Sequence, residues 1–531
     1  MTMVRSQDTY LLWISILPKI LLTVTLLRFI LITFMAVSDV VIKDHNPGDD
    51  VFRFDLRLDT KHGDINCFCL EGLACDPSWK SWDRNKESRG CVEKGKTASK
   101  NNQLLANFFL QPMTKWDSAR FLALAADPWI RHPCAECDDP FLRSEQAHAF
   151  FPLFPLMIRS FASTLKQILP SCLLPPTFEA VLVLSAFLIN IFSFIIALLC
   201  LIALTLNLIR KSTQEQSDEL FIVGRIVTLF CLNPATIFYC VSYSEAVFAM
   251  YTFGGYCLYS LGYSYLAVLP WVAASYTRSN GCFVSVWLII QGLAACLQKH
   301  CSFQKRLLVT LWHLAMAILV IVPLFIHDQR GYRLNCQGEI INADCENLTG
   351  SFYNYVQRKH WNVGFLHYFQ LKQIPNFLLA APILIYSGSG AWNWIRISWR
   401  KQPEALRLQC WKSRLFNWAF WALQQSKMQD EIVRSPADTL FTPAMLADYA
   451  ILAMAALLGF TTAHVQISSR LICSTSPAIY WQLARSCLSN KRNVTKEGEK
   501  SERLWNPTVV IYLGIYVVVG TIMHVNFLPW T

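Results

Sequence analysis

Long apolar runs recur along the whole chain and are separated by short polar or charged connections. Each run approaches the roughly 20 residues that an α-helix needs to cross the hydrocarbon core of a bilayer. We predict spans at 10–37, 179–208, 220–238, 244–261, 262–277, 282–297, 307–327, 376–395, 446–463, 471–486 and 507–527. The pattern therefore predicts an all-α fold, a polytopic transmembrane helical bundle of about 11 spans.

The composition agrees with a membrane protein. Hydrophobic residues make up 53% of the 531 residues, charged residues make up 16%, and the mean hydropathy is +0.32. An ordinary soluble domain has about 25% charged residues. These values disfavour a soluble enzyme and exclude a disordered chain or a coiled coil. The net charge of +11 comes from basic clusters between apolar runs, with no basic stripe interleaved with aromatics, so we expect no nucleic-acid partner.

The basic clusters predict the orientation in the membrane. Lys and Arg gather after the runs that end at 208, 297, 395 and 486, and the positive-inside rule assigns these connections to the cytoplasm. The intervening loops then face the lumen. We predict a retained signal-anchor span over 1–41, followed by a first lumenal loop with interfacial helices over 42–178. Transmembrane helices over 179–327 lead to a second lumenal loop over 328–375. The C-terminal transmembrane helices lie within 376–531, with cytoplasmic loops at 396–445 and 487–506.

The segment 148–170 tests this orientation, because a further span there would move every later basic loop to the lumen. We therefore expect it to lie along the lumenal surface or to re-enter the membrane. Pro152 and Pro155 stand three residues apart and favour a broken helix over a continuous span.

Cysteines and glycosylation sequons agree with the same orientation. Cys336 and Cys345 fall in the second lumenal loop, where an oxidising compartment favours disulfides. Of the sequons at Asn347 and Asn493, only Asn347 is predicted to face the glycosylation machinery. Residues 53–105 show no clear hydrophobic periodicity and are interpreted as an inserted Cys/Lys-rich loop. The cysteines of the first lumenal loop are Cys67, Cys69, Cys75, Cys91, Cys134 and Cys137.

Polar and ionisable residues gather next to the lumenal ends of the predicted spans. Such residues are costly to place near the apolar slab and mark functional sites. A transporter would place them in the middle of the membrane, whereas a one-sided cluster suits chemistry on a lipid-linked substrate. Tyr243 and Arg470 belong to these polar groups. The candidate site residues are Asp44, Asp50, Trp116, Asp117, Arg120, Glu245, Arg278, Asn280, Trp361, Asn362, His464 and Gln466.

Several short motifs occur in the same order as in the PIG-V family, which they resemble. They are Trp116-Asp117 with Phe121-Leu122, the run 149–155, Asn233-Pro234-Ala235 with Tyr243-Ser244-Glu245, Arg278-Ser279-Asn280-Gly281, Trp361-Asn362-Val363-Gly364, Gln373-Ile374-Pro375-Asn376, His464-Val465-Gln466 and the ending Asn526 to Trp530. The chain departs from the family in the long stretch between Phe52 and Trp116, which leaves the relation of Asp50 to Asp117 open.

The resemblance implies the second mannosyltransferase of GPI-anchor assembly, with a GT-C fold. It implies an endoplasmic reticulum membrane location with a lumenal active site. The implied donor is dolichyl-phosphate-mannose, and the implied reaction is α-1,6 transfer to the mannosyl-glucosaminyl-phosphatidylinositol precursor. Other implied partners are lipids of that membrane. A small membrane partner subunit is a further possible partner.

The implied reaction inverts the anomeric centre, so one carboxylate should accept the proton of the acceptor hydroxyl. Asp117 is the candidate catalytic base, and its alternative role is to cap the following helix. Asp44 and Asp50 are rivals that more ordinarily order a loop. No Asp-x-Asp pattern occurs in the lumenal cluster, so we expect arginine to bind the donor phosphate without a metal or other cofactor.

The other candidates have two interpretations each. Arg278, followed by Arg120, would bind phosphate or extend to lipid headgroups. Glu245 would bind an acceptor hydroxyl or pair with Arg225 or Arg278. Trp116 and Trp361 would stack on sugar or anchor the interface. The remaining polar candidates, which would contact lipid phosphate or sugar or be structural, are Asn280, Asn362, His464 and Gln466.

Three other functions stay open at this point. The first is another dolichyl-phosphate-sugar-dependent glycosyltransferase of the same fold. The second is a lipid transporter or scramblase, which predicts flux without formation of a glycosidic bond. The third is a non-catalytic subunit, in which loss of the Asp117 carboxylate would be silent.

Overall fold

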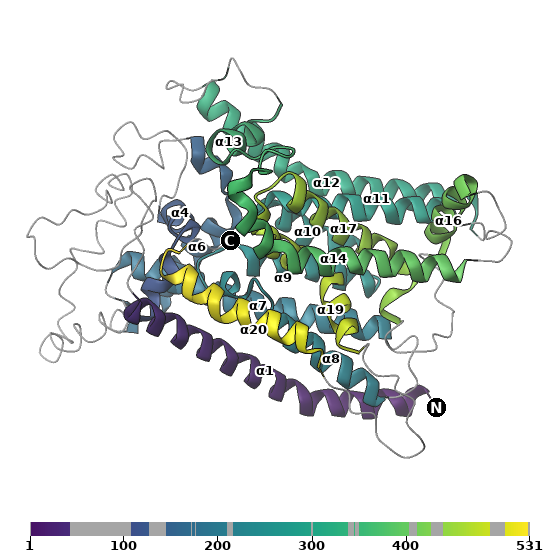
Figure 1. Cartoon of the computed structure of the whole chain (residues 1–531), viewed down its shortest axis with the longest axis horizontal. Coiled ribbons are helices and arrows are strands. Elements are labelled where there is room, and N and C mark those ends of the chain that lie inside the picture. Colours follow the sequence, from purple (N-terminus) through teal and green to yellow (C-terminus); the bar gives the residue numbers. More distant parts are fainter. Residues whose placement is uncertain are drawn as a thin grey trace, which may run out of the picture.

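The computed structural model is a bundle of helices, most of which run along its long axis (Figure 1). It describes residues 2–42, 108–126, 145–170, 173–175, 177–209, 216–298, 301–337, 345, 350–402, 411–425, 439–488 and 505–528. Within these ranges there is no β-strand. The predicted all-α fold is therefore confirmed.

Six helical segments of the described chain are long and apolar enough to cross a membrane. They are Leu17–Val41 in α1 (Thr2–Val41), α7 (Phe178–Ile209), Ser279–Cys296 ending with α11 (Phe283–Cys296), α12 (Phe303–Cys336), Leu371–Lys401 ending with α14 (Ile374–Lys401), and α20 (Pro507–Val525). Shorter helices on the other apolar runs are α8 (Gln216–Cys231), α9 (Glu245–Ser260), α10 (Ser264–Thr277), α17 (Leu446–Thr461), α18 (Ser468–Thr475) and α19 (Ala478–Leu488). The chain is therefore a polytopic helical membrane protein.

The predicted span 220–238 is wrong in its second half, because α8 ends at Cys231. Asn233 turns the chain there. Its side-chain amide donates to the Phe230 carbonyl over 2.7 Å, and its Oδ1 accepts from the Ala235 N–H over 2.8 Å. Pro234 follows, and proline cannot continue the helical hydrogen bonds. Residues 232–244 therefore form an irregular segment within the bundle.

The predicted span 471–486 is also wrong, because it is broken into α18 and α19. The break lies at Ser476 and Pro477. Proline has no N–H to donate, and it disfavours helical backbone at the residue before it. The break leaves α18 as a separate short helix of eight residues.

The expected broken helix in 148–170 is instead the continuous helix α6 (Leu153–Ile168). Pro152 is the residue before its first turn, and Pro155 lies within that turn. N–H groups of a first turn have no partner inside the helix, so proline there removes no hydrogen bond. The prediction was wrong because it assumed that both prolines lie in the interior of a helix, where proline breaks the helix.

Two predicted loops contain helices. The α12 helix continues past the predicted span end at residue 327 to Cys336, which forms a disulfide with Cys345. The predicted second lumenal loop also contains α13 (Phe352–Trp361), and the predicted cytoplasmic loop 396–445 contains α16 (Trp411–Gln425). Both loops are therefore more ordered than their polar sequence indicates.

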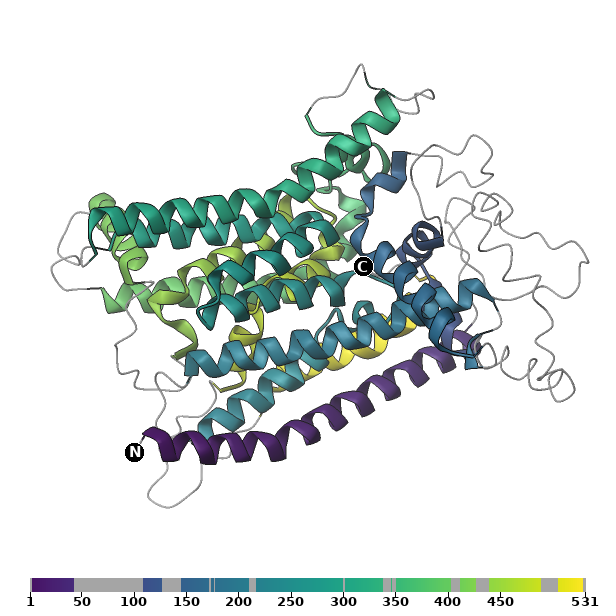
Figure 2. The same ribbon diagram turned by 180° about the vertical axis from the view of Figure 1, so that it is seen from behind.

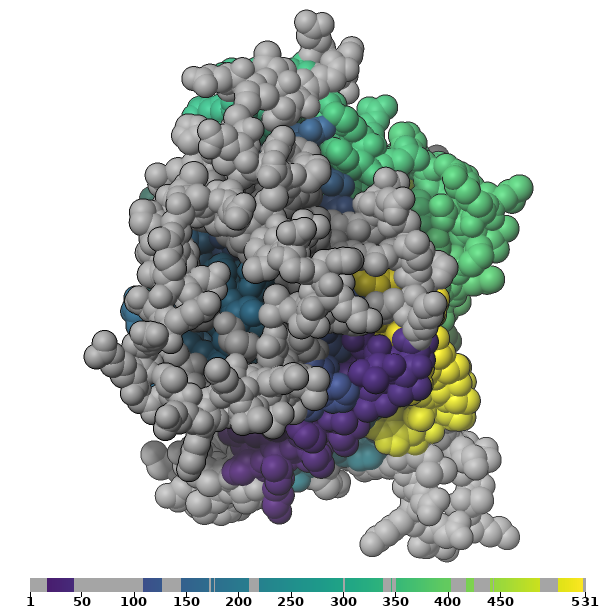
Figure 3. Space-filling model, turned by 90° about the vertical axis from the view of Figure 1, so that its left-hand side faces the viewer, coloured from purple at the N-terminus to yellow at the C-terminus, as the bar shows by residue number. Residues whose placement is uncertain are grey.

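The helices α4 (Asp117–Ala126), α6 and α13 lie together at one end of the bundle, and α1 begins at the other end (Figure 1). We call the first of these the cavity end. Seen from behind, α7 and α8 lie between α1 along one edge and α12 along the other (Figure 2). Viewed onto the cavity end, α1 and α20 lie side by side along one edge of the molecule (Figure 3).

Candidate functional site

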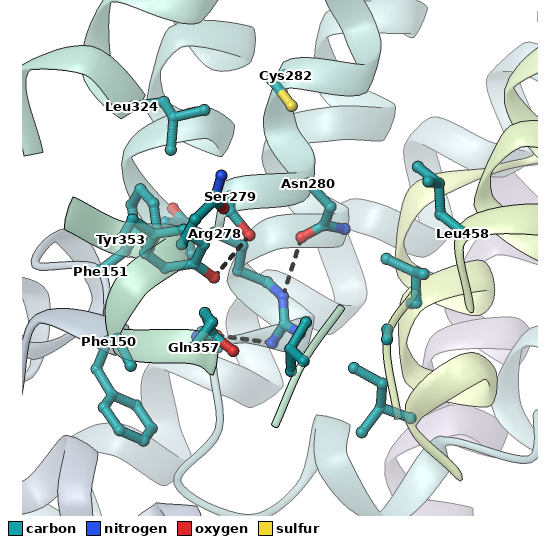
Figure 4. Close-up of a pocket in the computed structure, with 18 of the residues that line it drawn as sticks. Phe150, Phe151, Arg278, Ser279, Asn280, Cys282, Leu324, Tyr353, Gln357 and Leu458 are labelled. Atoms are coloured by element: carbon teal, nitrogen blue, oxygen red, sulfur yellow. Dashed lines mark hydrogen bonds between the residues drawn. The ribbon is translucent and has the colours of Figure 1, made fainter. Parts of the chain in front are cut away.

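A cavity of about 680 Å³ opens at the cavity end, between helices from distant parts of the sequence (Figure 4). Asp117 from the start of α4 lines it together with Arg278, which follows α10. Other predicted site residues in its wall are Asn280, Trp361 and His464, and Arg470 of α18 lines it as well. The structure thus brings five of the predicted site residues to one space.

Arg278 and Arg470 are joined behind the cavity wall by one carboxylate oxygen. Oε1 of Glu245 lies 2.7 Å from Nη1 of Arg278 and 2.6 Å from Nε of Arg470. The Glu245 side chain is 0% exposed, whereas the Arg278 side chain is 17% exposed. A buried carboxylate between two guanidiniums neutralises part of their charge and fixes both at the cavity. Of the predicted partners of Glu245, Arg278 is therefore found.

Asp117 lies beside this group and keeps contact with the cavity. Its Oδ2 is 3.8 Å from Nη1 of Arg470, and its side chain is 37% exposed. Its N–H donates to the hydroxyl of Tyr243 over 3.1 Å. Burial, together with the nearby Asp117 carboxylate, raises the pKa of Tyr243 well above its ordinary value, so this phenol stays protonated. Asp117 is the first residue of α4. Its partly exposed carboxylate is accessible to a ligand in the cavity.

The irregular segment 232–244 positions Tyr243 because two transmembrane helices hold it. Asn190 of α7 donates to the carbonyls of Val241, over 2.6 Å, and of Tyr243, over 2.9 Å. Arg28 of α1 donates to the hydroxyl of Thr236 over 2.8 Å. These side chains replace the helical hydrogen bonds that the segment lacks, as buried irregular backbone requires.

Arg278 is positioned by the tight turn between α10 and α11. The short helix η6 (Ser279–Cys282) begins after Arg278, and Asn280 Oδ1 accepts from Arg278 Nε over 3.3 Å. The Asn280 amide also donates to Thr475 of α18 over 2.8 Å. A Cβ on Gly281 would lie 2.4 Å from the Ser275 Cα atom, so only glycine permits this close approach.

The end of α13 forms another part of the cavity wall. Trp361 is its last residue, and its carbonyl bonds to Nε2 of His464. The His464 ring also stacks on Tyr368 at 4.5 Å. Burial lowers the pKa of His464 more than the Trp361 carbonyl raises it, so the imidazole is neutral at neutral pH. His464 thus positions the end of α13, where Asn362 adopts left-handed backbone with φ 52°.

Besides Glu245, four predicted site residues of the described chain do not line the cavity. Trp116 donates to the His524 carbonyl over 3.2 Å and packs on Phe527. Gln466 accepts from Tyr368 over 3.0 Å. The other two are Arg120, which lies over the Phe150 and Trp361 rings, and Asn362. Asp44, Asp50 and the sequon Asn347 lie outside the described residues.

Two residues that the structure places at the site have weaker signals in the sequence. Arg470 was predicted as a lumenal polar residue but not as a site residue, because its contact with Glu245 is long-range. Asn190 lies near the middle of the apolar run 179–208. A polar residue inside a span is expected to have a function, so that run contained a usable signal.

One part of the cavity wall is apolar. It is formed from α11, α12 and α17 by Phe283, Ile321, Leu324, Phe325 and Leu458. Phe325 and Ile321 are also exposed on the side of the bundle, so this wall is continuous with a surface that would face lipid. The cavity therefore joins a charged region to an apolar one, as a ligand with a polar head and a lipid chain requires.

Comparison with known proteins identifies similar chains. The family model described as mannosyltransferase (PIG-V) matches residues 88–531. GPI alpha-1,6-mannosyltransferase 2 of Cricetulus griseus is 26% identical over 493 residues, 80% of this chain and 89% of its own. The protein of the same name from Homo sapiens is 26% identical over 491 residues, 80% of this chain and 89% of its own. GPI mannosyltransferase 2 of Schizosaccharomyces pombe is 28% identical over 298 residues, 55% of this chain and 54% of its own. No solved structure shows a significant match.

Proposed function

The chain belongs to the PIG-V mannosyltransferase family, and from this membership we propose that it adds the second mannose of the GPI anchor, in α-1,6 linkage, to the mannosyl-glucosaminyl-phosphatidylinositol precursor. The names of its relatives from mammals and yeast support this acceptor class. The observation on which the proposal depends is the cavity that joins Asp117 to the Arg278–Glu245–Arg470 group. We call Arg278 and Arg470 the arginine pair, and Glu245 is the carboxylate that they share.

The proposed donor is dolichyl-phosphate-mannose. Its phosphate needs cations, and Arg278 and Arg470 offer two guanidiniums in the same wall. Guanidinium groups bind phosphate through charge-assisted hydrogen bonds, often two at a time. Its long chain needs an apolar path, and the wall around Phe325 offers one that continues to the side of the bundle.

The proposed step is an inverting substitution at C1 of the donor mannose. The bond from C1 to the phosphate oxygen breaks while the acceptor hydroxyl oxygen forms a bond to C1. The hydroxyl proton passes to the Asp117 carboxylate, and dolichyl phosphate leaves with the electron pair of the broken bond. The arginine pair stabilises the charge that develops on the leaving phosphate. Glu245 keeps the two guanidiniums in place and does not contact the cavity.

We propose that the protein lies in the endoplasmic reticulum membrane with the cavity facing the lumen. The disulfide between Cys336 and Cys345 supports an oxidising compartment at the cavity end. Arg400 and Lys401, at the end of α14, support a cytoplasmic location for the other end of that helix.

Complementation tests the proposed function directly. The full-length chain should restore surface GPI-anchored proteins in cells that lack the second GPI mannosyltransferase. Microsomes from these cells should transfer radiolabelled mannose from dolichyl-phosphate-mannose to the one-mannose GPI precursor but not to an N-glycan precursor. Transfer to the N-glycan precursor alone would favour another enzyme of the same fold. Normal expression without restoration or transfer would overturn the proposal.

A further inference from the structure

Helix α13 has two distinct faces. Phe352 and Val356 are buried against α12 and the segment that precedes α6. Asn354, Gln357 and Trp361 all line the cavity. Residues spaced by three and four lie on one side of a helix, so these three form a continuous stripe opposite the apolar face. We call Asn354, Gln357 and Trp361 the α13 stripe.

The stripe is held at a fixed place beside the arginine pair. The Tyr353 hydroxyl donates to Ser279, the residue after Arg278, over 3.0 Å (Figure 4). The Tyr353 N–H donates to Oδ1 of Asp328 in α12 over 2.7 Å. Lys359 forms an ion pair with Glu145 on another side of the helix. These contacts attach α13 to three other parts of the bundle, so the stripe is a preformed wall.

The polar groups of the stripe are uncharged and open to a ligand. Within the described residues, the side-chain amides of Asn354 and Gln357 form no hydrogen bond, although both line the cavity. The cavity therefore has guanidiniums in one wall and neutral amides beside an indole in the neighbouring wall. An anion is best bound by the first wall. Amides that donate and accept, next to an aromatic face, match a sugar with its adjacent hydroxyls.

We propose that the α13 stripe binds the glycan part of the acceptor glycolipid and distinguishes it from other lipid-linked acceptors. This inference rests on the proposed function. The donor has a single mannose, which the proposed reaction places next to the arginine pair and Asp117. The acceptor has further sugars that extend from the bilayer. Helix α13 lies at the cavity end, packed against the last turns of α12 (Figure 1), where such sugars would pass.

Steady-state kinetics of the full-length enzyme in detergent test the proposal, with dolichyl-phosphate-mannose and synthetic mannosyl-glucosaminyl-phosphatidylinositol as substrates. The variant Asn354→Leu/Gln357→Met removes both amides at similar volume. The loss of two hydrogen bonds to the acceptor should raise the acceptor KM about 30-fold. The donor KM and the kcat at saturating acceptor should stay within about 2-fold. Gln370→Met is the matched control, because Gln370 is exposed outside the cavity.

The split between the two KM values decides the outcome. An unchanged acceptor KM would overturn the proposal, and an equal rise in the donor KM alone would assign the stripe to the donor sugar instead. Asn354→Leu, which changes an exposed side chain, gives a second measurement if the double variant does not fold, with a rise of about 5-fold expected. Absence of transfer by the unmodified enzyme would reject the proposed function itself and is distinct from both results.

Discussion

Arg470 and Asp117 meet at the cavity, with Nη1 of the guanidinium 3.8 Å from Oδ2 of the carboxylate. The same guanidinium is bonded more closely to Glu245, at 2.6 Å through Nε. Glu245 therefore fixes Arg470, and Asp117 is the more accessible of the two carboxylates. A base must be able to reach its substrate, whereas the Glu245 carboxylate is buried between two cations and does not line the cavity.

Replacement of Asp117 by Asn tests the base. The amide is of equal size but cannot accept the acceptor proton at neutral pH, so transfer should fall by about 10²-fold or more. The Tyr243 contact uses the Asp117 main-chain N–H, so Asn should not disturb it. Mannosyl transfer in microsomes, normalised to the amount of protein, measures the loss. Near-normal turnover would exclude Asp117 as the base.

Replacement of Glu245 by Gln tests the arginine pair. The substitution leaves two guanidiniums at one place without their shared counter-charge, and breaking a buried ion pair typically costs about 3–5 kcal/mol. The melting temperature in detergent and the donor affinity should both fall. Glu145→Gln is the control, because it breaks an ion pair at the same end with a partner, Lys359, that is 43% exposed. Equal effects of the two substitutions would contradict the assigned role of Glu245.

The helices were largely predictable because each span must satisfy its backbone internally and be apolar along its length. The errors occurred where side chains replaced the backbone as hydrogen-bonding partners. Asn233 ends α8 by an Asx-type turn, and Arg28 and Asn190 stabilise the irregular segment that follows. No local pattern marks such long-range partners, so an apolar run such as 220–238 resembles a continuous span.

The candidate site was predictable in part because the charge pattern predicts which polar residues share one side of the membrane. Asp117 lies in the predicted first lumenal loop and Arg278 follows a predicted span on the same side, and the structure puts both in one cavity. Trp116 adjoins Asp117 in sequence but has φ 58°, which turns its side chain toward α20. Trp116 and Asp117 are therefore neighbours in sequence, but only Asp117 lines the cavity.

Asn190 should stabilise the fold through the segment it holds. Asn190→Leu removes the donor for the Val241 and Tyr243 carbonyls, and each buried carbonyl left without a partner costs about 1–3 kcal/mol. We expect a lower melting temperature in detergent. Ser193→Ala on the same helix is the control, since the Ser193 hydroxyl has no hydrogen-bond partner in the described chain. A neutral Asn190→Leu variant would show that this anchor is dispensable.

The attachment of α13 should weaken at low pH. Burial alone would raise the pKa of Glu145, but Lys359 and His360 outweigh it and lower the pKa. The stabilisation is therefore complete above the ordinary pKa of about 4.3 and is lost as the pH falls through the lower folded value. The difference in the free energy of unfolding between wild type and Glu145→Gln should be small, about 1 kcal/mol or less because Lys359 is half-exposed, and should vanish once the pH lies below the lowered folded pKa. A difference that persists there would contradict the assignment.

Sugar attachment should report the sidedness of the cavity. Asn347 follows Cys345, which is joined to the end of α12 at the cavity end, and a lumenal cavity would expose this sequon to the glycosylation machinery. Asn493 follows α19 and is predicted to be cytoplasmic. Endoglycosidase treatment should therefore shift the electrophoretic mobility of the wild type and of Asn493→Gln but not of Asn347→Gln. The glycan is large and added only in the lumen, so the shift depends on topology and not on activity. Sugar on Asn493 instead would reverse the orientation, and with it the lumenal location of the proposed transfer.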